Sequence, residues 1–128
     1  MISKVTKGVT ISVEVEYNPQ QSAVLLQEFA FAYTITMHNS AANTVQLLRR
    51  HWFIHDSNIT MREVEGEGVV GQKPILHPGE SYNYTSGCVI STEMGKMFGY
   101  FIFKDLHSAK EFSVEIPEFP LIAPFKMN

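Results

Sequence analysis

The stretch Val9-Thr10-Ile11-Ser12-Val13-Glu14-Val15-Glu16 decides the fold class. Its apolar residues occupy the odd positions and its polar residues the even positions. Successive side chains of a β-strand point to opposite faces of the sheet, so this alternation predicts a strand with one buried face. Tyr17-Asn18-Pro19 ends the strand, because proline has no backbone N–H to donate to a sheet. Residues 18–25 are predicted to form a loop.

The same period of two recurs along most of the chain. Six further strands are predicted over residues 29–38, 45–55, 59–64, 81–85, 96–104 and 110–116. Gly66 to Pro74 and Ser86 to Met94 lack the alternation and are predicted to be irregular. Val24 to Glu28 has room for one helical turn. The C-terminal tail is expected to be extended because of its three prolines, Pro117, Pro120 and Pro124.

About seven short strands separated by turns are typical of a β-sandwich. The sequence therefore predicts a single all-β domain over residues 1–128, an immunoglobulin or fibronectin type III-like sandwich of two antiparallel sheets. The expected core combines the large apolar faces of several strands: Val9, Ile11, Val13, Val15, Phe29, Phe31, Tyr33, Ile35, Trp52, Phe101 and Phe103. Trp52, the only tryptophan, is expected between the sheets.

Composition narrows the class of protein. The 128 residues carry a formal net charge of -3 and a single cysteine, Cys88. Nucleic-acid binding depends on a basic field, so this charge argues against a nucleic-acid partner. One cysteine cannot form an intrachain disulfide, and the first residues lack the apolar core of a signal peptide. No apolar run approaches the ~20 residues of a membrane helix. We therefore expect a cytoplasmic protein without membrane insertion.

Gly66-Glu67-Gly68-Val69-Val70-Gly71 matches the GxGxxG pattern of dinucleotide-binding folds. In those folds a helix follows the glycines, and its N-terminus holds the pyrophosphate. Here Pro74 and Pro78 follow, and proline at these points stops a helix. The motif is therefore not a dinucleotide site. Its glycines either permit positive φ angles in a structural loop, or expose backbone N–H groups to a small anion or a partner.

Arg49-Arg50-His51-Trp52 places two arginines directly before the lone tryptophan. Alternation puts Arg49 and His51 on one face of the strand and Arg50 and Trp52 on the other. One hypothesis is structural, with Trp52 in the core and one arginine paired to a glutamate. The other is an arginine-lined patch for an anion or an acidic partner. The candidate anion or partner site combines the two arginines with the glycine loop: Arg49, Arg50, Gly66, Gly68 and Gly71.

Other reactive side chains give no clear site. Five histidines are scattered along the chain, and two of them, His51 and His55, lie on one side of a strand about 13 Å apart, too far to share an ion. No metal site is predicted. The acidic residues at spacing two, Glu63, Glu65 and Glu67, are expected to face solvent along an edge.

Cys88 has no neighbouring base or positive group in the sequence that would lower its pKa. It is therefore interpreted as a small buried hydrophobe. No catalytic residues and no cofactor are predicted, and the chain is not expected to be an enzyme.

Five blocks of the sequence together resemble the bacterial ApaG family, also called the DUF525 domain. They are Leu47-Leu48-Arg49-Arg50-His51-Trp52, Gly66-Glu67-Gly68-Val69-Val70-Gly71-Gln72-Lys73-Pro74, Leu76-His77-Pro78-Gly79-Glu80, Tyr84-Thr85-Ser86-Gly87-Cys88 and Phe112-Ser113-Val114-Glu115-Ile116-Pro117. The resemblance implies a fibronectin type III-like sandwich in the stand-alone bacterial form. It also implies an association with cobalt resistance and magnesium efflux.

Related domains appended to eukaryotic proteins look like protein-interaction modules, and the family supplies no catalytic residues. We therefore expect a non-enzymatic binding or accessory module whose partner is another protein, with a homo-oligomer left open. One alternative is a pyrophosphate- or nucleotide-binding protein that uses the Gly66–Gly71 loop. A second alternative is direct binding of a divalent cation.

Overall fold

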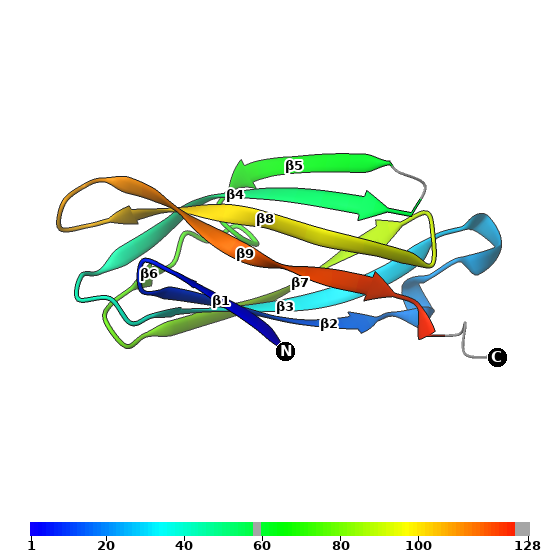
Figure 1. Ribbon diagram of the computed structural model, residues 1–128, viewed down its shortest axis with the longest axis horizontal. Helices are drawn as coiled ribbons and strands as arrows, with labels where there is room; N and C mark the ends of the chain where they lie inside the picture. The colour runs from blue at the N-terminus through cyan, green and yellow to red at the C-terminus, as the bar shows by residue number, and fades with distance from the viewer. Residues whose placement is uncertain (58–59, 125–128) are drawn as a thin grey trace.

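The computed structural model describes residues 1–57 and 60–124 and consists almost entirely of strands (Figure 1). One sheet contains β1 (Ile2–Thr6), β2 (Val9–Tyr17), β3 (Phe29–Asn39) and β7 (Ser81–Ile90), in the order β1-β2-β3-β7. The other contains β5 (Met61–Glu67), β4 (Val45–Asp56), β8 (Met94–Asp105) and β9 (Glu111–Ile122), in the order β5-β4-β8-β9, and β6 (Ile75–Leu76) also pairs with β4. All pairs are antiparallel, so the predicted sandwich is confirmed.

The core lies between the two sheets where the sequence predicted it. The expected apolar residues of β2, β3, β4 and β8 are buried, and Trp52 is only 2% exposed. Its indole contacts three aromatic rings, those of Tyr33, Phe101 and Phe119. Val15 is the exception: it is 37% exposed. It lies beyond Val13, where the β1 pairing ends, so its strand has β3 on one side and no β1 on the other.

Several strand assignments differ from the prediction, including β6, which was not predicted. β1 has almost no buried side chain, so the hydrophobic pattern could not reveal it. β7 continues to Ile90, and β5 continues to Glu67, so both extend into segments predicted to be irregular. β9 runs to Ile122 through Pro117 and Pro120. Backbone pairing defines these ends: β7 pairs with β3, β5 with β4, and β9 with β8. The prolines are tolerated in β9 because it lies at a sheet edge.

The connection between β2 and β3 contains two short 3₁₀ turns, Pro19–Gln21 and Val24–Leu26, and the second matches the helical turn expected at Val24. Residue 59, where a strand was predicted to begin, lies outside the described residues. Across residues 1–57 and 60–124, no helix has the length and apolar character needed to cross a bilayer.

Candidate functional site

The β4–β5 ladder brings together most of the residues that the sequence singled out. Arg50 pairs with Gly66, His51 with Glu65, and Trp52 with Val64. Since side chains alternate along both strands, one face of this ladder points into the sandwich and the other faces outward. The seven residues of β5 therefore contribute to two different groups of polar side chains, one on the inward face and one on the outward face.

On the inward face, the Arg50 side chain packs against Gly66. The Arg50 Nη1 atom donates hydrogen bonds of 3.0 Å to the carbonyl oxygens of Glu67 and Gly68. A Cβ atom on Gly66 would lie 2.6 Å from the guanidinium, so any other residue would displace the end of the arginine side chain from this position. The first glycine of the GxGxxG pattern therefore lies in a strand, not in a loop, and accommodates an arginine.

The remaining glycines shape a tight turn after β5. Val69 and Gln72 exchange both backbone hydrogen bonds, at 2.8 and 2.9 Å, and Val70 and Gly71 at the corner have φ angles of 47° and 76°. Two positive φ angles in a two-residue hairpin are typical of a type I′ turn. Gly68 is also at positive φ, and its N–H donates to the Leu48 carbonyl. As predicted, no helix follows the turn, and the amides of residues 68, 69 and 72 are already bonded.

A groove of about 760 Å³ lies between the edge strands β5 and β7, which belong to different sheets. Its walls include Tyr33, Trp52 and Val64, and two arginines reach it, Arg50 and Arg62. The Arg62 Nη2 atom donates to the Val89 carbonyl across the groove at 2.6 Å. Within the described residues, neither guanidinium lies within 4.0 Å of a carboxylate. Arg49 differs, because it pairs with Glu111 at 2.6 Å.

Buried polar groups lie beside this groove. The Tyr84 hydroxyl is buried and has no hydrogen-bond partner among the described residues. Burial raises the pKa of Tyr84, and the charge of Arg50 partly opposes that shift. Burial also raises the pKa of Tyr33, against a hydrogen bond with Ser86. Both phenols are therefore neutral donors at neutral pH.

Cys88 lines the same groove. Burial raises the pKa of its thiol to about 11, although the nearby Arg62 acts in the opposite direction. The Sγ atom lies 3.5 Å from the Met97 sulfur. A thiol that stays protonated is a poor nucleophile, so the chemistry of Cys88 is that of a small apolar side chain.

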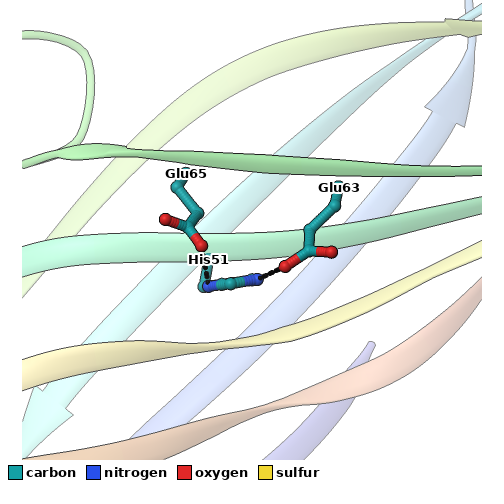
Figure 2. Close-up of side chains that lie close together, drawn as sticks. All are labelled: His51, Glu63 and Glu65. Atoms are coloured by element: carbon teal, nitrogen blue, oxygen red, sulfur yellow. Dashed lines mark hydrogen bonds and ion pairs between the residues drawn. The ribbon is translucent and has the colours of Figure 1, made fainter.

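The outward face holds a histidine between two glutamates (Figure 2). The His51 Nε2 atom lies 2.6 Å from Glu63 Oε2, and its Nδ1 atom lies 3.1 Å from Glu65 Oε1. The Tyr100 hydroxyl is also 3.1 Å from Nδ1. The three acidic residues are exposed as predicted, but two of them contact His51, and the third, Glu67, pairs with Lys73 at 2.7 Å.

Sequence reasoning tested His51 against other histidines and missed this cluster. His55 lies farther along β4, His38 bonds Ser81 and His77 bonds Thr44, so the structure does not bring the histidines together. The cluster could have been found from the register of the β4–β5 hairpin, which places Glu65 directly opposite His51.

Comparison with known proteins identifies the family. The ApaG domain (DUF525) matches residues 19–105, which is more than half of the chain. This chain belongs to the ApaG family. ApaG proteins from Acidithiobacillus ferrooxidans are 48% identical over 115 residues, covering 90% of each chain, and one from Pectobacterium carotovorum is 47% identical over 91% of this chain and 92% of its own.

Solved structures agree with the ApaG assignment. The crystal structure of the putative ApaA protein from Bordetella pertussis superposes with a TM-score of 0.87 at 41% identity, covering 91% of this chain and 94% of that chain. A second crystal structure, target SoR45, gives a TM-score of 0.85 at 38% identity and covers 91% of this chain and 88% of that chain. The resemblance seen in the sequence is therefore confirmed for both family and fold.

Proposed function

We propose that this chain is a non-enzymatic binding module that holds an extended, acidic segment of a partner protein in the groove between β5 and β7. The observation that carries the proposal is the pair of arginines in this groove, Arg50 and Arg62, whose hydrogen bonds go to backbone carbonyls. A guanidinium can exchange such bonds for a bidentate contact with a carboxylate, which is stronger because both partners are charged.

The strands beside the groove suit an extended segment. Among residues 1–57 and 60–124, β5 pairs with β4 alone and β7 with β3 alone, so each has one edge that no strand pairs with. An added strand can bond to such an edge while its alternate side chains enter a pocket. Val64 and Val89 at the rim are exposed and offer apolar contacts. Backbone pairing would supply affinity, and the arginines would select negative charge.

The raised pKa of Cys88 supports binding over catalysis, because the thiol in the groove remains protonated. In this proposal the ApaG association with cobalt resistance and magnesium efflux arises through the partner, and the interaction takes place in the cytoplasm. Pyrophosphate or nucleotide binding at the Gly66–Gly71 turn has less support, because the amides of Gly68, Val69 and Gln72 already donate to backbone carbonyls and Glu67 lies beside the turn.

The test uses extended peptides with alternating valine and glutamate, against matched peptides with glutamine, and follows amide chemical shifts. We expect the acidic peptides to shift Arg62, Val64 and residues 86–89. Arg50→Gln and Arg62→Gln should each weaken binding about tenfold, the loss of one charged hydrogen bond. Arg49→Gln is the matched control, since Arg49 faces outward and pairs with Glu111.

Two results would contradict the proposal. One is binding that does not distinguish acidic from neutral peptides and survives both groove substitutions. The other is saturable binding of inorganic pyrophosphate or ATP at micromolar concentration, with shifts centred on Gly68 and Gly71, which would favour the nucleotide alternative.

A further inference from the structure

We infer that His51, Glu63 and Glu65 form a binding site for a divalent transition-metal ion of the zinc class on the outward face of the β4–β5 ladder. One ligand atom from each residue lies within 4.8 Å of the other two, and this is the one such group of three in the described residues. Figure 2 shows the two carboxylates, both from β5, pointing toward opposite edges of the same imidazole ring.

The imidazole is held in a fixed orientation. Its ring stacks on Phe53 and Tyr100, with centroid distances of 4.8 and 4.9 Å, and its side chain is only 14% exposed. The Tyr100 hydroxyl contacts Nδ1. When Nδ1–H donates to that hydroxyl, Nε2 presents its lone pair to an ion. A ring nitrogen bonded to an orienting group is the usual arrangement of a metal-binding histidine.

The two carboxylates can complete the site. Glu63 Oε2 already lies 2.6 Å from Nε2, next to the position that an ion on Nε2 would take. Metal–ligand bonds of about 2.0–2.2 Å place donor atoms roughly 3–3.5 Å from one another. Glu63 Oε2 must therefore move slightly away from Nε2, and the Glu65 carboxylate, which lies 3.1 Å from Nδ1, must turn toward the Nε2 side. Their side chains are 54% and 66% exposed and are free to do so. They lie on the outward face of the β4–β5 ladder, away from the other sheet.

The donor set selects the class of ion. Imidazole nitrogen favours zinc, nickel and similar ions, whereas magnesium and calcium prefer oxygen ligands alone. One imidazole with two carboxylates, and water at the remaining position, suits a four-coordinate zinc-class ion.

The site does not depend on the groove, because Arg62 and Val64 lie on the other face of β5. A result for one site therefore leaves the other untouched. The structure also provides a matched control for the ligands, because Glu67 is the next residue on the outward face but pairs with Lys73.

The experiment is calorimetric titration of untagged protein with ZnCl₂ and with MgCl₂, together with nitrogen chemical shifts of the histidine rings. We expect one zinc ion per chain at micromolar or lower Kd, a shift at His51 Nε2, and magnesium affinity weaker by about a hundredfold or more. Glu63→Gln, Glu65→Gln and His51→Phe, which keeps the ring stack, should each weaken zinc binding about tenfold or more. Glu67→Gln should leave it unchanged.

Zinc binding that persists in Glu63→Gln and Glu65→Gln, that appears only at millimolar concentration, or that shifts other histidines and not His51 would overturn the inference. So would magnesium binding of equal affinity. The ring-nitrogen shifts are measured on the unmodified protein, so they decide the question even if His51→Phe does not fold.

Discussion

On the inward face of β4 and β5, Arg50 lies against Gly66 and Trp52 opposite Val64, whereas on the outward face His51 lies opposite Glu65 and Phe53 opposite Glu63. The strands and their register are the same, but the surroundings are not. Inward side chains pack into the core and the groove, so their volume and hydrogen bonds are constrained. The outward carboxylates are more than half exposed, so water can replace most of the interactions that they lose when a neighbouring residue is changed.

The largest effect should come from Trp52→Ala on the inward face. Trp52 is buried among Tyr33, Phe101 and Phe119, and the truncation leaves a cavity that these rings cannot fill. We expect the free energy of unfolding to fall by about 3–5 kcal/mol. Urea denaturation followed by circular dichroism measures it. An unchanged urea midpoint would show that Trp52 is not needed for stability, and the inward face would then be no more constrained than the outward face.

The next effect concerns the reactivity of Cys88, which faces the groove. Its pKa is raised from the ordinary 9.0 to about 11, so at pH 8 it should carry about a hundredfold less thiolate than a free cysteine. Alkylation by iodoacetamide should be correspondingly slow and should accelerate up to about pH 11. Because the folded thiol holds its proton between pH 9 and 11, its contribution to stability declines over that interval. Rapid alkylation at pH 7 in folded protein would contradict this.

A smaller effect tests the contact between Arg50 and Gly66. Gly66→Ala should displace the guanidinium from the carbonyls of Glu67 and Gly68 and lower stability by about 1–2 kcal/mol. In an Arg50→Ala background the same change should cost little, since the clash is gone. The double-mutant cycle isolates this coupling. Equal costs in both backgrounds would show that Gly66 serves another purpose.

The turn beyond the ladder offers a stabilising change. Val70 is β-branched yet has a φ angle of 47°, a conformation that asparagine adopts more readily. Val70→Asn should raise the free energy of unfolding by about 0.5–1 kcal/mol. Gly71→Ala, at a φ angle of 76°, should do the opposite and serves as the control. A loss of stability in Val70→Asn would indicate that the valine side chain makes a needed contact.

The smallest effect is expected on the outward face in metal-free buffer. Glu63→Gln should change stability by less than about 0.5 kcal/mol, because the Glu63 carboxylate is more than half exposed and water screens its interaction with His51. Thermal unfolding in the presence of a chelator measures it. A loss of 2 kcal/mol or more would mean that the outward cluster is structural, and the contrast between the two faces would fail.

The sequence predicted the sandwich and most of its core because alternating strands such as Val9–Val15 record which face is buried. It could not reveal β1, whose side chains are mostly exposed, nor the ends of β5 and β7, which depend on backbone pairing with another strand. The prediction that no helix follows the glycine pattern was correct. The contact between Gly66 and Arg50 follows from the register of β4 and β5. The same register brings Glu63 and Glu65 close to His51, and alternation of apolar and polar residues alone does not specify it.

The two sides of the sandwich should also differ in hydrogen exchange. On the β1 and β9 side, Lys4 pairs with Glu115, and the Glu115 amide donates to Thr6, so the sheets are fastened to each other. On the side of β5 and β7, the Arg62 contact with Val89 is the corresponding link. Amides of β5 and β7 should therefore exchange through local opening while those of β3 and β8 exchange only on global unfolding. The edge that opens most readily is the edge at which a partner strand could be added.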